Sequence, residues 1–160
     1  MQKSCYPRLG LESNFMKAGI DYIGVSCCFV CHDGKGKILL GKRGENCRDE
    51  NGRWDFGGGQ VEHGESFEQT LRRELMEEYC VEPVSIKYIG TRNLIRSLDQ
   101  GSSHWIANLH LVEVDPSQVQ NGEPHKIDEI GWFDLDDLPE PMHSAVADQM
   151  EFVKEYLRDV

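Results

Sequence analysis

Two spacings of hydrophobic residues alternate along the chain. Runs in which aliphatic, β-branched and aromatic side chains are continuous or recur at every second position predict β-strands. We expect such strands at residues 22–32, 37–43, 54–56, 84–98, 104–114 and 129–133. Glycine-rich and polar stretches separate them, so turns are predicted at residues 33–36 and 97–103.

The second spacing, of three to four residues, predicts two helices. Ser66 is a natural N-cap and Gln69 completes a capping box, so we expect a helix over residues 67–79. Neither proline nor glycine interrupts this segment. An apolar stripe from Met142 to Leu157 predicts a second, amphipathic helix over residues 143–158, which packs that stripe against the core.

The order of these elements predicts the fold. The chain is expected to form a β-hairpin, a short strand, a helix, a second β-hairpin, a further strand and a final helix. This order suits an α+β protein in which a mixed β-sheet lies between helices. We expect residues 1–160 to form a single domain, with residues 1–19 as an N-terminal arm or a first short strand.

The acidic composition limits the partners. A formal net charge of −11 makes the chain a poor electrostatic binder of nucleic acid polymers and of anionic membranes. A polyanionic substrate would also be repelled unless metal ions neutralised the site. No apolar run reaches the ~18 residues that a membrane span requires, and the first residues lack a signal-peptide pattern. We therefore expect neither a nucleic acid polymer nor a membrane as a partner.

The six cysteines lack the spacing of a disulfide framework, which favours a reducing, cytoplasmic location. Cys28 and Cys31 form a C-x-x-C pair, so a zinc site is the alternative. They lie in a predicted strand, where alternation sends them to opposite faces, and no second pair follows. Buried free thiols are the better interpretation.

Three glutamates, Glu74, Glu77 and Glu78, cluster on one arc of the first predicted helix. Like charges at this spacing destabilise a helix by about 0.2–0.5 kcal/mol per pair, so the cluster needs a partner. Two interpretations are open. The carboxylates bind Mg²⁺ or Mn²⁺ behind the preceding glycine turn, or they form a solvated acidic face with Arg72 and Arg73 as intrahelical partners.

The segment from Gly59 to Val81 is similar to the Nudix box, G-x5-E-x7-R-E-U-x-E-E-x-G-U, in which U is a bulky aliphatic residue. The matching residues are Gly59, Glu65, Arg73, Glu74, Leu75, Glu77, Glu78 and Val81. Cys80 stands where the family has glycine, which normally ends the helix in a left-handed conformation. We therefore expect strain or a different helix exit at Cys80.

The Nudix resemblance implies an α/β/α sandwich and an enzyme that hydrolyses a diphosphate joining a nucleoside to a further group. It implies that the ligands of Mg²⁺ or Mn²⁺ are Glu74, Glu77, Glu78 and the Gly59 carbonyl. Arg73 would orient these glutamates and Glu65 would support them. For the general base, the resemblance leaves Glu77, Glu129 and Glu123 open, and we favour them in that order.

The resemblance is strongest to MutT-like members, which implies hydrolysis of a nucleoside triphosphate to a monophosphate and pyrophosphate. Nucleotide sugars or other nucleoside diphosphate derivatives are the enzymatic alternative. A non-catalytic nucleotide-binding module is a further alternative, although such modules typically lose box glutamates that this chain keeps. Many relatives pair as homodimers, so the resemblance also allows a homodimer.

Substrate contacts are expected at the glycine turn and on the predicted strands. The backbone around Gly58 can approach a phosphate closely. Arg43 either binds a phosphate or is the solvated end of a strand. Base recognition is expected from Trp105, Asn108 or Trp132, and core packing is the alternative role for each aromatic residue.

Overall fold

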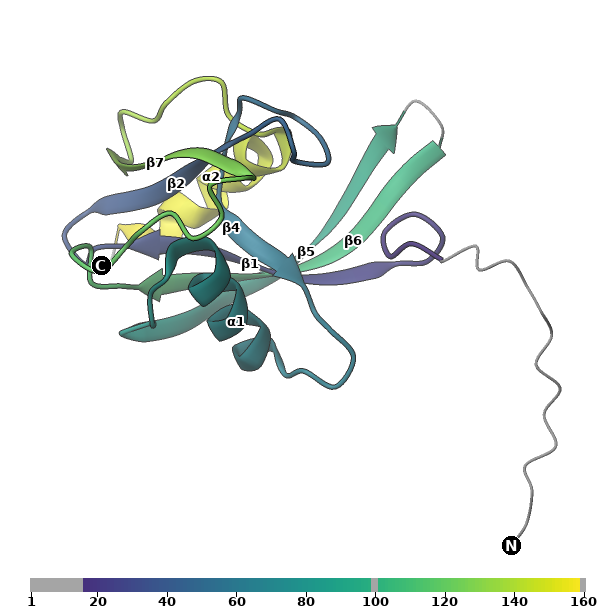
Figure 1. The fold of residues 1–160 in the computed structure, drawn as a ribbon, viewed down its shortest axis with the longest axis horizontal. Helices are drawn as coiled ribbons and strands as arrows, with labels where there is room; N and C mark the ends of the chain where they lie inside the picture. The colour runs from purple at the N-terminus through teal and green to yellow at the C-terminus, as the bar shows by residue number, and fades with distance from the viewer. Residues whose placement is uncertain (1–15, 99–100, 159–160) are drawn as a thin grey trace, which may run out of the picture.

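A mixed sheet of seven strands forms the middle layer of the protein (Figure 1). The computed structural model describes residues 16–98 and 101–158. The strands are β1 (Gly24–His32), β2 (Lys37–Arg43), β3 (Trp54–Asp55), β4 (Gly57–Gln60), β5 (Ser85–Leu98), β6 (Gly101–Glu113) and β7 (Ile127–Asp134). The helices are α1 (Phe67–Tyr79) and α2 (Ser144–Leu157).

Strand β1 holds the sheet together at its centre. The strands follow the order β3-β2-β1-β6-β5, while β4 pairs with β1 and β7 pairs with β2. Among the described strands, β1 and β6 are parallel and the other pairs are antiparallel. One edge of β1 pairs with β6. Its other edge pairs with β4 from Ser26 to Phe29 and with β2 at His32. The β4 glycines are therefore fixed against the middle of the sheet.

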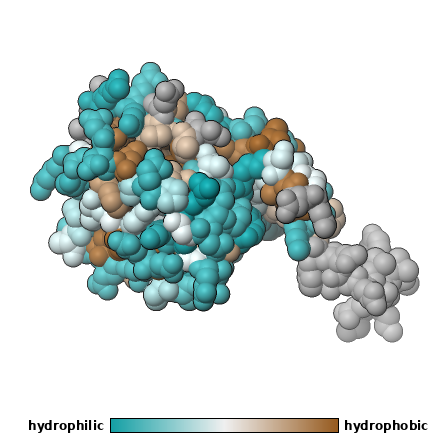
Figure 2. All heavy atoms as spheres, turned by 90° about the horizontal axis from the view of Figure 1, so that it is seen from above, coloured by the Kyte–Doolittle hydropathy of each residue, from teal (hydrophilic) through white to brown (hydrophobic). Residues whose placement is uncertain are grey.

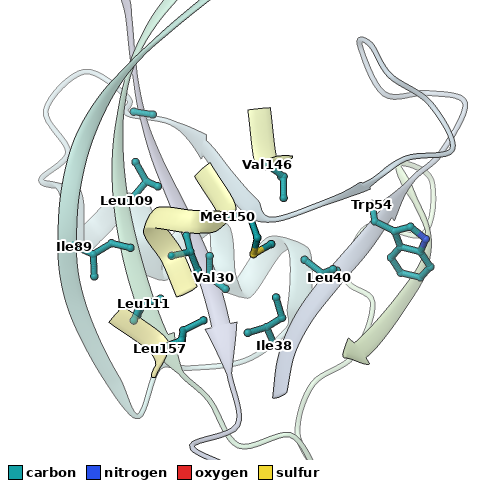
Figure 3. Close-up of a cluster of buried hydrophobic side chains, with 12 residues drawn as sticks. Val30, Ile38, Leu40, Trp54, Ile89, Leu109, Leu111, Val146, Met150 and Leu157 are labelled. Carbon is teal, nitrogen blue, oxygen red and sulfur yellow. The ribbon is translucent and has the colours of Figure 1, made fainter. Parts of the chain in front are cut away.

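The two helices cover opposite faces of this sheet, which confirms the predicted α/β/α sandwich (Figure 1). Leu71 and Leu75 of α1 pack on one face with Phe29 of β1. Val146 and Met150 of α2 pack on the other face with Val30, as Figure 3 shows. Neighbouring β1 residues enter different cores because side chains alternate along a strand.

Helix α1 has the predicted bounds and the predicted N-terminus. The Gln69 N–H donates to the Ser66 hydroxyl at 3.2 Å, and the Ser66 N–H donates to Gln69 Oε1 at 2.8 Å, which closes the capping box. At the other end Cys80 adopts the left-handed conformation with φ of 53°. Of the two expectations for Cys80, strain is therefore the one observed, because a Cβ atom is disfavoured there.

Two predicted turns were wrong. The turn predicted over residues 97–103 is too long, because β5 continues to Leu98 and β6 begins at Gly101, with Ser97 paired to Ser102. Residues 99–100 lie outside the described part of the chain. The glycine turn expected at residues 57–59 is strand β4, so these glycines allow close approach rather than chain reversal.

The strand cysteines alternate as the sequence predicts. Cys27 and Cys31 are buried in the core under α1, whereas Cys28 packs against the core under α2. All three are free thiols. The C-x-x-C residues therefore face opposite sides of the sheet, which rules out a zinc site that uses both.

Much of the surface is hydrophilic in the view of Figure 2. The far end of the β5–β6 hairpin extends away from the body beside the segment that precedes β1 (Figure 1). Exposed apolar side chains in these segments are Ile20, Tyr22, Ile23, Ile95 and Leu98. Of the arm predicted at residues 1–19, residues 1–15 lie outside the described part. No helix among the described residues is both long and apolar enough to span a membrane.

Candidate functional site

Two hollows adjoin each other on either side of β4. The first, here the carboxylate cleft, lies beside α1, and its polar lining includes Asp55, Glu74, Glu77, Glu78, Glu123 and Lys126. The second, here the Trp105 pocket, lies beside α2, and its lining includes Phe56, Leu94, Arg96, Trp105, His143 and Gln149. Arg43, Gly58 and Gly59 line both. A ligand that crosses β4 would therefore reach both hollows.

Glu78 lies in the carboxylate cleft between α1 and β4. Its carboxylate oxygens accept hydrogen bonds from the Gly58 N–H at 3.4 and 3.3 Å, and it forms no ion pair within the described residues. Burial raises the pKa of Glu78 well above its ordinary value, and the nearby carboxylates of Glu74, Asp55 and Glu123 raise it further. Glu78 is therefore an enclosed carboxylate whose ionised form has no cationic partner among the described residues.

Glu74 lies one helical turn before Glu78 and faces the β4 backbone. Burial raises the pKa of Glu74, although its contact with Arg73 acts in the opposite direction. A Cβ atom at position 59 would collide with Glu74 Oε1, so glycine is needed there to admit the carboxylate. This close approach brings the Gly59 backbone beside the glutamate cluster.

Arg73 holds the carboxylates of the cleft in place. Its Nε and Nη2 donate to the two Glu65 oxygens at 2.8 and 3.0 Å, and its Nη1 donates to Glu74 Oε1 at 2.5 Å. Nη1 also lies 3.5 Å from Glu77 Oε2. Hydrogen bonds from Arg73 and Thr70 lower the pKa of Glu65 to about 2. Arg73 is therefore a bidentate clamp on Glu65 that also reaches two of the clustered glutamates.

The donor set of the cleft suits a divalent cation. Carboxylate oxygens are the ligands that Mg²⁺ and Mn²⁺ prefer. The raised pKa values of Glu78 and Glu74 show that burial and neighbouring carboxylates disfavour their ionised forms, which a cation would stabilise. Within residues 16–98 and 101–158, no three acidic, histidine or cysteine side chains converge closely enough to hold an ion as they stand. Glu74 and Glu77 turn toward Arg73 instead, so binding would require new rotamers.

Five charged residues of the cleft come from outside α1, namely Arg43, Arg48, Asp55, Glu123 and Lys126. Glu123 lies in the loop before β7, where its N–H donates to Asn121 Oδ1 at 3.1 Å and its carboxylate pairs with Lys126 at 2.7 Å. Asp55 of β3 accepts from Arg43 Nη1 at 2.8 Å. Asp55 and Lys126 were missed by the sequence analysis, since neither belongs to a motif with fixed spacing.

An ion-pair network forms one wall of the Trp105 pocket. Arg43 and Arg96 donate to Asp49 at 2.7 and 2.9 Å, which ties the loop after β2 to β5. Glu50 accepts from the Ser144 N–H at 2.9 Å and lies 3.2 Å from Arg96, which ties the same loop to the start of α2. Each carboxylate here faces an arginine, so the wall is electrically balanced.

Trp105 lines the opposite side of this pocket. Its indole ring packs on Gly24 and Gly19, where an added Cβ atom would overlap the ring. The Arg48 guanidinium lies 5.8 Å from the ring centroid, within cation–π range. The pocket therefore offers an aromatic surface beside a rigid, paired wall.

A model of the NUDIX domain matches residues 23–156. The chain belongs to the NUDIX domain family. The residues that match the Nudix box run from Gly59 in β4 to Val81, just after α1, and Glu74, Glu77 and Glu78 of the box line the carboxylate cleft.

Individual NUDIX relatives differ in the substrates that their names state. The chain is 34% identical over 110 residues to an oxidized purine nucleoside triphosphate hydrolase from Danio rerio, which covers 65% of this chain and 62% of the relative. It is 45% identical over 56 residues to CTP pyrophosphohydrolase from Escherichia coli (strain K12), covering 35% and 41%. The chain thus spans less than two thirds of the length of these relatives.

A solved structure supports the fold assignment. The MutT NUDIX hydrolase from Burkholderia pseudomallei aligns with a TM-score of 0.72 and 30% identity, covering 81% of this chain and 97% of that chain. The similarity therefore extends well beyond the Nudix box.

Of the predicted site residues outside the Nudix box, some line the two hollows and others do not. Trp105 and Arg43 line the hollows, although Arg43 already donates to Asp49 and Asp55. Trp132 packs against the core under α1. Asn108 is buried, where it accepts from the Thr91 hydroxyl and donates to the Ser26 carbonyl. The structure therefore does not bring Trp132 or Asn108 to the Trp105 pocket.

Glu129, expected as an alternative general base, is also away from the carboxylate cleft. It is exposed on β7 and pairs in register with Lys42 of β2. Its neighbour Ile130 packs toward α1, so alternation turns Glu129 to the opposite face. Glu123, the residue ranked below it, lines the cleft instead.

Proposed function

We propose that this protein hydrolyses a nucleoside diphosphate-linked substrate with the help of Mg²⁺ or Mn²⁺. We infer that a nucleoside triphosphate is cleaved to a monophosphate and pyrophosphate. The observation that carries this proposal is the enclosed carboxylate of Glu78 beside Glu74, which forms no ion pair within the described residues and lies next to a pocket with an aromatic wall. A triphosphate could lie over the carboxylates while its base occupies the Trp105 pocket.

Glu78, Glu74 and Glu77 would hold the cation, with the Gly59 carbonyl as a further ligand. When bound, such an ion neutralises the diphosphate and lowers the pKa of the attacking water. Arg73 would position these carboxylates, because its guanidinium fixes Glu65 and Glu74 together. Phosphoryl transfer depends mainly on positioning and charge stabilisation, so this arrangement can carry much of the catalysis.

For the general base we favour Glu77, with Glu123 as the alternative. Glu77 is half exposed and is held only at 3.5 Å by Arg73, so it can reach a water molecule in the cleft. Glu123 enters the cleft from the opposite wall but is paired with Lys126. A general base must lie within hydrogen-bond reach of the water that it activates, and both residues are candidates because both line the cleft.

A cytoplasmic location is supported by the five described cysteines, all free thiols, because a reducing compartment keeps thiols unpaired. A homodimer stays a prediction.

The proposal is tested by a panel of nucleoside triphosphates and nucleotide sugars, incubated with Mg²⁺, with Mn²⁺ and with a chelator. We expect pyrophosphate release from at least one triphosphate, dependent on the metal. Release of a monophosphate from the sugar nucleotides alone would move the substrate to that class. No turnover of any member, together with binding measured by calorimetry, would identify a non-catalytic binding module instead.

A further inference from the structure

Gln149 is a polar residue in the buried stripe of α2. It lies three residues after Val146 and four before Val153, both of which are in the core under the helix, so it occupies the same helical face. Its exposed fraction is 5%. The helix therefore presents an amide where its neighbours on that face are apolar.

The hydrogen-bonding capacity of the Gln149 side chain is not fully used. Its Oε1 is buried without a hydrogen bond within the described residues. A buried polar group in this state is destabilising, and native proteins retain few of them. Gln149 also lines the Trp105 pocket, so a side chain with unused hydrogen-bonding capacity adjoins a space that can admit a ligand.

Several polar groups in and beside this pocket are already paired. Asp49 accepts from Arg43 and Arg96, and Glu50 accepts from Ser144. His143 accepts from the Ala145 N–H at its Nδ1, which leaves its Nε2 directed at Glu50 Oε1, 3.4 Å away. Gln149 takes no part in these pairings and keeps an unused hydrogen-bond acceptor.

We propose that Gln149 determines base specificity by hydrogen-bonding the edge of the nucleobase that lies against Trp105. This inference rests on the proposed nucleotide function. A primary amide offers one acceptor and a pair of donors, so it matches a base edge on which a donor stands beside an acceptor, as on N6 and N7 of adenine. The ligand class is a nucleotide whose base presents such an edge.

The test compares kcat/KM of the four common nucleoside triphosphates with that of ribose 5-triphosphate, which has no base. For the preferred base, Gln149→Leu is expected to lower kcat/KM by roughly ten- to a hundredfold, the value of one good amide–base pair. The rate with ribose 5-triphosphate should stay unchanged, because the triphosphate contacts the other hollow. Gln149→Glu should shift preference toward guanine, whose N1–H and N2–H are adjacent donors.

Ser103→Ala is the matched control. The Ser103 hydroxyl is also buried and has no hydrogen-bond partner in the described part of the chain, but it does not line the Trp105 pocket. This variant should keep the wild-type base profile. Thermal unfolding checks the fold, and we expect Gln149→Leu to melt at or above the wild-type temperature because it removes an unpaired polar atom.

The outcomes separate this inference from the proposed function. If wild-type protein cleaves triphosphates and Gln149→Leu keeps the wild-type base profile, the role of Gln149 is overturned and the proposed function stands. A uniform loss that includes ribose 5-triphosphate would also overturn it, because it would indicate a structural role. If wild type neither cleaves these compounds nor binds their non-hydrolysable analogues in calorimetry, both proposals fail.

Discussion

The carboxylate cleft and the Trp105 pocket lie side by side but balance their charges differently. In the pocket, burial acts to raise the pKa of Asp49, but Arg96 and Arg43 outweigh it and the pKa is lowered. In the cleft, burial and neighbouring carboxylates together raise the pKa of Glu78. The charges of the pocket are thus paired within the protein, whereas the cleft holds carboxylates that the proposed cation would neutralise.

The largest effect on turnover is expected from removing the carboxylate of Glu78 from the cleft. We expect Glu78→Gln to lower metal-dependent turnover about 10²–10³-fold or more, the scale of losing one electrostatic contributor to a transition state. Its unfolding midpoint at pH 7 should equal or exceed that of wild type, because a carboxylate whose pKa is raised by folding destabilises the folded state above its unfolded pKa.

Glu68→Gln is the control for this variant. Glu68 lies on the same helix, exposed and paired with Arg72. Steady-state kinetics and thermal unfolding should find it close to wild type, and near-normal turnover of Glu78→Gln would contradict the role of the cleft.

The next effect concerns the clamp that shapes the cleft. Arg73→Lys should lower turnover roughly ten- to a hundredfold, the usual cost of losing a residue that positions metal ligands. Lysine keeps the charge but cannot make the bidentate contact with Glu65. Arg72→Lys, whose contacts with Glu68 and Glu82 are exposed, should leave kinetics unchanged. Equal rates for the two variants, measured with the same metal and substrate, would remove Arg73 from the account.

For a variant in the wall of the Trp105 pocket, we expect the main change in the stability of the protein. We expect Asp49→Asn to reduce the free energy of unfolding by about 1–3 kcal/mol at pH 7, since two arginines lose their carboxylate. Because folding lowers the pKa of Asp49 from 3.8, its contribution is present above that pH and is lost as pH falls through the folded value.

Denaturant unfolding of both proteins at pH 7 and near pH 3 checks this prediction. The difference in unfolding free energy between wild type and Asp49→Asn should narrow at the lower pH. The exposed Asp136→Asn variant is the control and should show no difference at either pH. A difference that widens on acidification would contradict the charge balance described for the pocket.

The smallest effect is expected at Cys80, the departure from the Nudix box. Cys80→Gly should stabilise the protein by about 0.5–1 kcal/mol, because glycine adopts the left-handed conformation at little cost but is more flexible when unfolded. Denaturant unfolding measures this gain. Glu50→Gly is the contrast, since Glu50 has a φ of 49° but also binds Ser144, so its loss should be destabilising. A destabilised Cys80→Gly would mean that the thiol makes a contact that matters more than the backbone.

The residues of the carboxylate cleft could be predicted from the sequence far better than those of the Trp105 pocket. The glutamates of the cleft come from one helix whose cap and periodicity are local, so their spacing alone places them together. The pocket draws Asp49, Arg96, Trp105 and Gln149 from four separate segments, and only long-range pairing of β1 with β6 and packing of α2 bring these together. Glu129 was misplaced because strand alternation, not proximity in sequence, decides which face it occupies.

Binding of Mn²⁺, followed by titration calorimetry, tests the central claim most directly. Wild-type protein should bind Mn²⁺, Glu68→Gln should bind it equally well, and Glu78→Gln should bind it at least about tenfold more weakly. Wild-type protein that takes up no Mn²⁺, or Glu78→Gln that binds it as tightly as wild type, would contradict the account.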